Sequence, residues 1–361
     1  MEKIKIIALY LPQYHPTPKN DLWWGAGFTE WTNVGKAKKL FPGHYQPRIP
    51  ADLGYYDLRL PESREAQAKM ASEYGIAGFC YYHYYFGNGK RELELPFQEV
   101  LNSGTPDFPF CLAWANESWY AKSWDIDKVN TKKLLIEQRY DDEEDYVRHF
   151  NLILPALRDP RYITVDNKPI FMIYRPRKFL DVENFLKVWR QLALANDLPG
   201  IYFIAQSKKM GKESKKYLAQ GFDAVNSVRL HNYDKNLIWY KKLWIKLQHN
   251  ILQFPKIMPY CKAAEKFIMP EDALENIIPT IITGWDHTPR SGKNGSVMTG
   301  FTPEHFSRHV KSAIAAVKNK QPEHQIIFLK SWNEWGEGNY IEPDLKFGKQ
   351  FLDVVRKLVN S

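Results

Sequence analysis

The sequence predicts a (β/α)8 barrel, because short apolar segments alternate with helical patterns along most of the chain. Eight of these segments have the length and composition of strands, and each is followed by a crossover long enough to return the chain. A barrel of about 250 residues fits into 361 residues and leaves room for insertions. An open, doubly wound sheet is the alternative, but the sequence has neither a G-x-G-x-x-G loop after the first strand nor a Walker loop.

The predicted strands share an apolar interior and end in polar or aromatic residues. They are Ile4–Pro12, Ile76–Tyr85, Phe108–Asn116, Pro169–Pro176, Ile201–Ser207, Phe222–Ser227, Ile277–Gly284 and Gln325–Ser331. The helices between them show apolar residues at helical spacing and helix-boundary signals. Leu60–Tyr74 has Pro61 near its start and Gly75 just past its end, and Thr302–Pro303 is an N-cap followed by a favoured first residue.

The whole chain, residues 1–361, is expected to form a single domain with two inserts. Residues 13–56 are rich in Trp, Tyr, Pro and Gly and follow the first strand, so in a barrel they form a rim insert on the catalytic face. Residues 233–262 form a basic aromatic insert, in which Tyr240, Trp244, Leu247 and Ile251 fall on one helical face. A helix packed on the core with a solvated basic side is favoured, and an interfacial helix on anionic membrane is the alternative.

Aromatic residues make up 15% of the chain, which suits sugar rings and nucleobases as well as ordinary cores. The net charge of +9 would allow an anionic partner. Nucleic acid is nevertheless disfavoured, because no zinc-finger spacing, RNP-type signature or basic heptad region is present.

Three cysteines without a C-x-x-C pair argue against a disulfide framework or a structural zinc. The first residues do not resemble a signal peptide, and no apolar stretch has the length of a transmembrane helix. We therefore expect a cytoplasmic protein, with a peripheral position at the inner membrane as the variant that an interfacial helix would imply.

The last predicted strand ends in Ser331–Trp332–Asn333–Glu334–Trp335–Gly336–Glu337–Gly338. Barrel enzymes place catalytic groups at the carboxyl ends of strands, so Glu334 and Glu337 are the candidate catalytic pair. Glycosidic cleavage usually requires two carboxyl groups flanking the bond, and residues three apart in a helical turn lie close enough for a retaining enzyme. The alternative is a pair of glutamates that merely stabilises the start of a helix.

Polar and aromatic residues at the other strand ends, or in the loop after strand one, are candidate substrate-binding residues. They are Tyr10, Tyr14, His15, Trp24, Trp31, Tyr82, His83, Trp114, Asn116, Glu117, Tyr174, Arg175, Gln206, Trp285, Trp332, Asn333 and Trp335. A packed aromatic layer is the alternative at Tyr81–Tyr85, and a structural rim network is the alternative at Asn116–Glu117. Asp125–Ile126–Asp127 is a D-x-D triplet, a weak signal for a metal-dependent nucleotide-sugar transferase.

Several long motifs resemble the WbsX-type family. They are Tyr10–Leu11–Pro12–Gln13–Tyr14–His15–Pro16, Trp23–Trp24–Gly25, Gly27–Phe28–Thr29–Glu30–Trp31–Thr32–Asn33–Val34, Gly43–His44–Tyr45–Gln46–Pro47, Gly78–Phe79–Cys80–Tyr81–Tyr82–His83–Tyr84, Trp114–Ala115–Asn116–Glu117 and the eight residues ending at Gly338. The resemblance extends over nearly the whole chain. It implies a role in lipopolysaccharide O-antigen or capsule biosynthesis.

That family is similar to glycoside hydrolase family 99, the endo-α-mannosidases and mannanases, which are (β/α)8 barrels. The family 99 motif Asn-Glu-Trp-His-Glu matches Asn333–Glu337, except that Gly336 replaces the histidine. The resemblance implies that Glu334 deprotonates a sugar 2-hydroxyl, which attacks C1, and that Glu337 is the general acid and then the base. It implies retention of configuration and neither a metal nor an organic cofactor.

The leading functional prediction is a glycosidase-like enzyme that cleaves or transfers glycosidic linkages of a bacterial-type surface polysaccharide or its precursor. A nucleotide-sugar glycosyltransferase of O-antigen or capsule biosynthesis is the second candidate, and a non-catalytic glycan-binding protein is the third. An oligosaccharide or polysaccharide is the expected partner, and nucleic acid is not.

Overall fold

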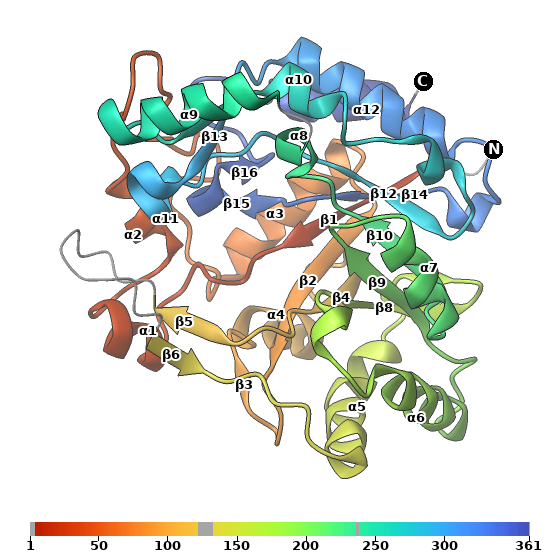
Figure 1. Ribbon diagram of the computed structural model, residues 1–361. Coiled ribbons are helices and arrows are strands. Elements are labelled where there is room, and N and C mark those ends of the chain that lie inside the picture. Colours follow the sequence, from red (N-terminus) through yellow and green to blue (C-terminus); the bar gives the residue numbers. More distant parts are fainter. Residues whose placement is uncertain (1–3, 122–132, 236–237, 361) are drawn as a thin grey trace. The chain divides into compact units, whose positions relative to one another are not determined.

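The computed structural model describes residues 4–121, 133–235 and 238–360 (Figure 1). Eight parallel strands follow the order β1-β14-β12-β10-β9-β8-β4-β2, and β1 also pairs with β2, which is the closed order of a (β/α)8 barrel. All eight predicted strands are therefore confirmed, as is the fold class. The chain forms two compact units. We call Met1–Phe79 with Ser227–Ser361 the catalytic unit, because the predicted catalytic residues Glu334 and Glu337 lie in it, and Cys80–Asn226 the middle unit.

The catalytic unit contains three of the parallel strands in full, together with the helices that follow them. Its regular elements are β1 (Lys5–Tyr10), α1 (Pro18–Trp24), α2 (Glu30–Gly35), α3 (Pro61–Glu73), α8 (Asn232–Lys235), α9 (Trp239–Ile251), β11 (Lys256–Pro259), α10 (Tyr260–Ala264), β12 (Ile277–Ile281), α11 (Thr288–Ser291), β13 (Ser296–Thr299), α12 (Pro303–Val317), β14 (Ile326–Leu329), β15 (Asn333–Glu334), β16 (Asn339–Tyr340) and α13 (Gln350–Val359). Short 3₁₀ turns are η2 (Pro270–Ala273), η3 (Gly292–Asn294), η4 (Pro322–His324) and η5 (Trp335–Glu337).

The core of this unit follows from the apolar sequence of its strands. β1 pairs in parallel with β14 in a register that sets Lys5 opposite Ile326, and β14 pairs in parallel with β12. Ile6, Ile7, Ala8 and Leu9 are fully buried. The rim insert 13–56 forms α1 and α2, each with a threonine N-cap at Thr17 or Thr29.

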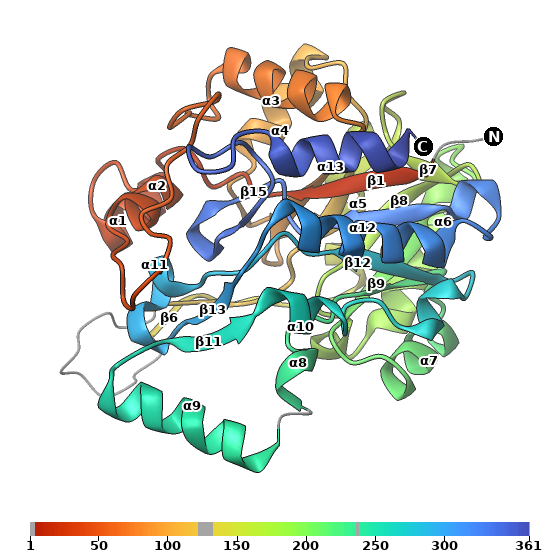
Figure 2. The ribbon, with the colours of Figure 1, turned by 90° about the horizontal axis from the view of Figure 1, so that it is seen from above.

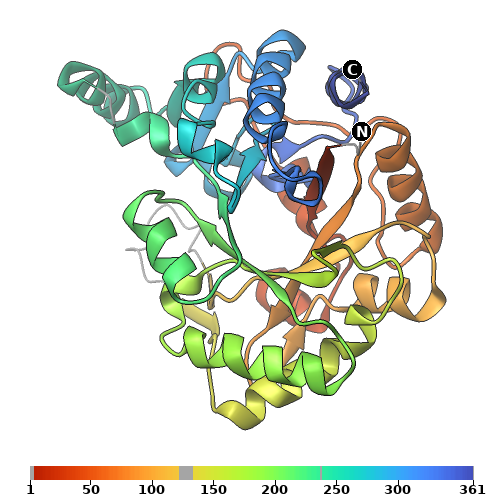
Figure 3. The same ribbon diagram turned by 90° about the vertical axis from the view of Figure 1, so that its right-hand side faces the viewer.

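The middle unit carries the remaining βα pairs. Its elements are β2 (Gly78–Tyr85), β3 (Arg91–Glu92), α4 (Leu95–Ser103), β4 (Phe110–Trp114), β5 (Trp119–Ala121), β6 (Lys133–Ile136), α5 (Glu143–Leu157), β7 (Thr164–Val165), β8 (Lys168–Ile173), η1 (Pro176–Lys178), α6 (Val182–Ala195), β9 (Tyr202–Ser207), α7 (Lys212–Ala219) and β10 (Ala224–Ser227). β8 pairs in parallel with both β4 and β9. In Figure 3 the yellow and green helices of this unit lie along one side of its strands.

The basic aromatic insert departs from the sequence prediction. It forms α9, and the side chains predicted to pack on the core are instead exposed, including Tyr240, Trp244, Leu247 and Ile251. The favoured prediction of a core-packed helix is therefore wrong. Amphipathic spacing cannot tell whether an apolar stripe is covered by the same chain. In the part of the chain that the structure describes, no helix is long and apolar enough to span a bilayer.

We expect Trp189→Ala to destabilise the protein by about 3–5 kcal/mol, because it removes a large buried side chain. Trp189 is fully buried on α6, packs against Phe171 and Phe185, and donates a hydrogen bond from Nε1 to the Tyr146 carbonyl at 3.1 Å. Urea unfolding measures the change. Trp239→Ala is the matched control, since Trp239 is 73% exposed. An equal loss of stability in both variants would contradict the described core.

Candidate active site

Glu334 and Glu337 lie on a small hairpin that follows β14. β15 and β16 pair antiparallel with Glu334 opposite Asn339, and η5 between them carries Glu337. Gly338 closes this turn at φ +55°, and a Cβ there would lie 2.6 Å from the Cβ and 2.9 Å from the backbone nitrogen of Asp286. Only glycine fits this position, so the spacing of the two glutamates is fixed by backbone geometry.

Asn333 and Tyr14 tie the hairpin to the end of β1. The Asn333 side chain accepts a hydrogen bond from the Leu11 backbone N–H at 2.8 Å and donates one to the Leu11 carbonyl at 3.0 Å. The Tyr14 hydroxyl donates to the Asn333 carbonyl and accepts from the Trp335 backbone N–H. All these groups are buried, so Asn333 and Tyr14 hold the backbone on either side of Glu334 in place. The sequence had suggested that both residues contact substrate.

Trp335 and Glu342 support the hairpin from inside. Trp335 stacks on Tyr340 with ring centroids 3.7 Å apart and donates a 2.6 Å hydrogen bond from Nε1 to Glu342. Gln67 and Tyr56 also donate to this carboxylate, at 2.7 and 2.9 Å. Burial raises the pKa of Glu342 to about 7, against the effect of these hydrogen bonds.

The Gly43–Pro47 motif acts on the site through Asp286. His44 Nε2 and Gln46 Nε2 each lie 2.8 Å from the Asp286 carboxylate, and the Thr288 hydroxyl donates to it at 2.6 Å. The Asp286 backbone N–H in turn donates to the Glu337 carbonyl at 2.7 Å. This motif therefore holds the segment after β12 against the hairpin.

Arg290 on α11 is the centre of the charged cluster. Its Nη1 lies 2.7 Å from Glu337 and 3.3 Å from Glu334, and its Nη2 lies 3.0 Å from Glu30 of α2. Lys330 Nζ lies 3.6 Å from Glu334, and His287 Nε2 lies 3.6 Å from Glu337. One guanidinium thus contacts three carboxylates, one from α2 and two from the hairpin after β14.

The pKa values of the two candidate catalytic carboxyl groups are shifted in opposite directions. Burial raises the pKa of Glu334, and the neighbouring charge of Glu337 adds to the shift against the effect of Lys330 and Arg290. Burial would also raise the pKa of Glu337, but Arg290, His287 and Lys330 outweigh it and hold the pKa well below its ordinary value. Of the pair, Glu334 therefore holds its proton to higher pH than Glu337.

Gly336 leaves the space that Glu30 and Arg290 occupy. A Cβ on Gly336 would lie 2.2 Å from Glu30 Oε2 and 3.0 Å from Arg290 Nε. The missing side chain therefore permits the ion pair between Glu30 and Arg290. Where the family 99 motif has a histidine, this chain has an acidic and a basic side chain brought in from other segments.

The remaining predicted residues of the catalytic unit have varied surroundings. Tyr10 is buried and donates to Gln67 at 2.6 Å, Trp285 is buried and donates to Ser296 Oγ, and Trp332 is fully buried. His15 is buried with Nδ1 3.0 Å from the Pro12 carbonyl. The two half-buried members are Trp24, near Phe28, and Trp31, whose ring lies 5.6 Å from that of Trp335.

In the middle unit, Asn116, Glu117, Tyr174 and Arg175 form a cluster at the carboxyl ends of β4 and β8. Arg175 Nε lies 2.8 Å from Glu117, and the Arg175 guanidinium lies 4.5 Å from the Tyr174 ring centroid. The Asn116 side chain accepts from the Arg175 backbone N–H at 2.7 Å. Glu117 is thus already paired with a cation, as the alternative of a structural rim network expects.

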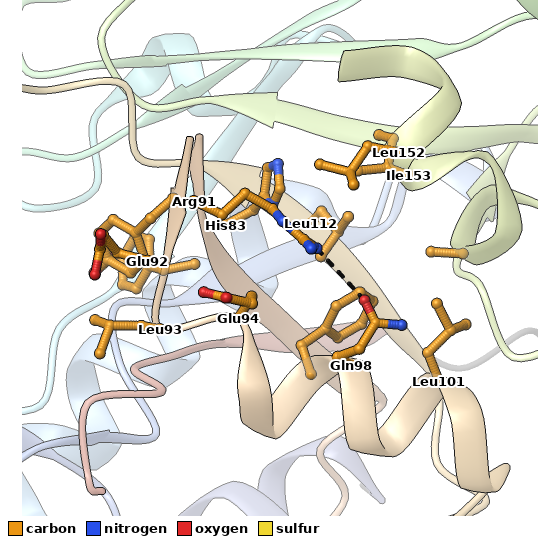
Figure 4. Close-up of a pocket in the computed structure, with 14 residues that line it drawn as sticks. His83, Arg91, Glu92, Leu93, Glu94, Gln98, Leu101, Leu112, Leu152 and Ile153 are labelled. Carbon is orange, nitrogen blue, oxygen red and sulfur yellow. Dashed lines mark hydrogen bonds between the residues drawn. The ribbon is translucent and has the colours of Figure 1, made fainter. Parts of the chain in front are cut away.

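His83 and Trp114 point away from the side of the strands where Tyr82 lies. The His83 ring lies 2.9 Å, Nε2 to Nε2, from His149 of α5, and burial lowers the pKa of His83 to about 3, so this pair is neutral. His83 lines a pocket among β2, β3, α4 and α5, next to Arg91 and Gln98 (Figure 4). Trp114 packs against His149 and Phe185. Neither placement fits the predicted substrate contact.

Tyr82 and Gln206 lie on the opposite side of their strands. The Tyr82 ring packs edge to face on Tyr174, with centroids 5.9 Å apart. Gln206 is buried beside Met172 and Asn226. The D-x-D triplet Asp125–Asp127 lies outside the described residues.

The profile of the family described as Glycosyltransferase WbsX matches residues 6–355. The chain belongs to the WbsX glycosyltransferase family. Two curated relatives, each called uncharacterized protein WxcX and from two strains of Xanthomonas campestris pv. campestris, are 33% identical over 98% of this chain. The chain spans about half the length of these relatives, 49% of each.

Solved structures share the barrel of this WbsX family member. One described as a glycoside hydrolase-like protein has a TM-score of 0.60 at 15% identity, covering 99% of this chain and 94% of the other. A glycoside hydrolase family 99 endo-α-mannosidase from Bacteroides thetaiotaomicron has a TM-score of 0.58 at 16% identity, covering 100% and 98%. At this identity the likeness shows the fold alone.

Sequence reasoning missed the charged partners of the WbsX glutamate pair: Glu30, His287, Arg290 and Lys330. Glu30 lies within a quoted motif and Arg290 follows the seventh strand closely, so both were visible as polar residues near strand ends. Their convergence on one point depends on how loops from distant segments fold, which periodicity does not encode.

We expect Gly336→Ala to lower activity by on the order of 10²-fold with little loss of stability. The new methyl group would displace the flexible Glu30 carboxylate and with it the orientation of Arg290. Glycan turnover and urea unfolding measure the two effects. Gly35→Ala is the matched control, because a Cβ there meets nothing within 4 Å. Full activity in folded Gly336→Ala would show that the Glu30–Arg290 pair does not position the glutamates.

Proposed function

We propose that this WbsX family member cleaves or transfers glycosidic linkages with Glu334 and Glu337 as its reacting carboxyl groups. The observation that carries this proposal is their joint contact with one Arg290 nitrogen, at 3.3 and 2.7 Å. Their contacting oxygens can therefore be at most the sum of these distances, about 6 Å, apart. Retaining glycosidases hold their two carboxyl groups about 5–5.5 Å apart, so the spacing supports retention of configuration.

The opposite pKa shifts of Glu334 and Glu337 support different catalytic roles for the two residues. One carboxyl group must protonate the leaving oxygen, and the other must stay ionised on the opposite side of the bond. Glu334 has the raised pKa and Glu337 has the lowered one. We therefore assign the proton donor to Glu334 and the ionised carboxylate to Glu337, which is the reverse of the order that the resemblance to family 99 implies.

Arg290 also stabilises the ionised state of Glu337. A guanidinium stays charged at any accessible pH, and its contact with Glu337 is the shorter of its two contacts with the pair. As the bond from the sugar carbon to the leaving oxygen breaks, Glu334 gives that oxygen its proton and the Glu337 carboxylate bonds to the carbon. Water or an acceptor hydroxyl then displaces Glu337 from the carbon and returns a proton to Glu334, so that configuration is retained. Glu30 balances the remaining charge of Arg290.

A bacterial-type surface polysaccharide or its precursor is the substrate class that we propose, including O-antigen and capsule chains. The support is the family description, glycosyltransferase, and the motif resemblance set out above. We propose further that the reaction needs no metal or organic cofactor and no nucleic acid, and that it takes place in the cytoplasm.

A nucleotide-sugar glycosyltransferase is the second candidate, because the family is described by that activity. Such an enzyme must bind a sugar nucleotide, whereas the mechanism above must bind an oligosaccharide. Calorimetric titration with a panel of sugar nucleotides and a panel of oligosaccharides separates the two candidates.

We expect both Glu334→Gln and Glu337→Gln to lose at least about 10²–10⁴-fold in turnover. With Glu334 as the proton donor, the loss in Glu334→Gln should shrink for aryl glycosides whose leaving groups need no protonation. The loss in Glu337→Gln should be similar for all leaving groups, because an amide cannot supply the negative charge.

The control is Glu183→Gln, an exposed glutamate on α6 of the middle unit, which should retain full turnover. Circular dichroism checks that each variant is folded. If good leaving groups rescue Glu337→Gln instead, the order implied by family 99 holds. Near wild-type turnover in either folded variant would remove that residue from the mechanism.

A further inference from the structure

α9 presents an apolar face that is exposed among the described residues of its unit. Six side chains on this face are between 45% and 73% exposed, namely Trp239, Tyr240, Leu243, Trp244, Leu247 and Ile251. Their spacing places them along one side of the helix. The less exposed residues Ile245, Gln248 and His249 lie on the other side of the helix. Figure 2 shows α9 at the edge of the catalytic unit, apart from its other long helices.

The composition of α9 suits the surface of a lipid bilayer. The helix has two Trp and one Tyr, three lysines at positions 241, 242 and 246, and neither Asp nor Glu. Trp and Tyr favour the boundary between headgroups and acyl chains, because their rings are apolar and their tips are polar. With 13 residues, α9 is suited to lying in the interface.

A second group of lysines lies beside the end of α9. Phe254, just after the helix, packs against Phe41 with ring centroids 6.0 Å apart. The residues leading to Phe41 include the exposed lysines 36, 38 and 39. Lys293 contacts Gln253 from another segment. Two further segments of the same unit thus bring basic residues near the C-terminal end of α9.

We propose that the α9 face docks on an anionic phospholipid surface, with Trp239 and Trp244 at the acyl boundary and the adjacent lysines on the headgroups. Charge complementarity favours this occupant over a second copy of the chain. The net charge is +9, and basic residues around the apolar face would repel their counterparts in a second copy. If the function proposed above holds, this docking brings the enzyme to glycans held at a membrane. The docking itself does not depend on that function.

Flotation with lipid vesicles tests the proposal on the full chain. Vesicles of phosphatidylglycerol and phosphatidylcholine should bind the protein, and vesicles of phosphatidylcholine alone should bind it far less. Trp239→Ala/Trp244→Ala should weaken binding to the anionic vesicles at least tenfold. The matched control is Leu22→Ala/Leu180→Ala, which removes side chains that are 81% and 95% exposed elsewhere, and it should bind like the wild type.

The charge component has its own pair of variants. Lys38→Gln/Lys39→Gln should weaken binding and reduce its salt dependence, because anionic headgroups attract lysines through a screened interaction. Lys215→Gln/Lys216→Gln, an equal change of charge at exposed lysines on α7, should bind like the wild type.

Several outcomes would overturn the proposal. They are no binding to anionic vesicles, undiminished binding by Trp239→Ala/Trp244→Ala, or equal binding to neutral vesicles. Light scattering of the lipid-free protein identifies the other occupant: a dimer that Trp239→Ala/Trp244→Ala dissociates would show that a second copy covers this face. None of these measurements involves glycan turnover, so their failure is distinct from failure of the proposed enzymatic function.

Discussion

The candidate site depends on one guanidinium, that of Arg290, which lies between the carboxylates of Glu30, Glu334 and Glu337. Without it, three acidic side chains with little exposure would face one another, and at least some would have to take up protons. Arginine suits this position because it cannot lose its charge and presents several donors in one plane. The contacts join α2, α11 and the hairpin after β14, so Arg290 also fixes three loops relative to one another.

The glycines of the hairpin make this arrangement possible. Position 338 requires glycine because its φ is positive and Asp286 lies close to it. Gly336 leaves open the space that the Glu30–Arg290 pair fills. A side chain at position 336 would therefore exclude this pair. Arg290 gives the site a permanent positive charge, which lowers the pKa of Glu337.

The sequence was enough to predict the barrel and to bring Glu334 and Glu337 together after its last strand, while their catalytic role stays a prediction. Apolar runs mark the eight strands, and strand ends mark the catalytic face of a barrel. It was not enough to set the direction of individual side chains. In β2, for instance, a run of aromatic residues gives no alternation, and His83 proved to face α5. The apolar spacing on α9 is the same whether that face is covered or exposed. The contact between Glu30 and Arg290 depends on the conformation of loops, which sequence periodicity does not describe.

The central claim is that Arg290 makes Glu337 the stronger acid of the pair, so that Glu334 holds its proton to higher pH. A carbon-13 NMR titration of protein labelled at glutamate carboxyl carbons tests it directly, with Glu334→Gln and Glu337→Gln assigning the two resonances. The account predicts that Glu337 stays ionised well below the ordinary glutamate pKa of about 4.3, and that Glu334 titrates above it. Two ordinary titrations, or a Glu337 that takes up its proton before Glu334 as the pH falls, would contradict it.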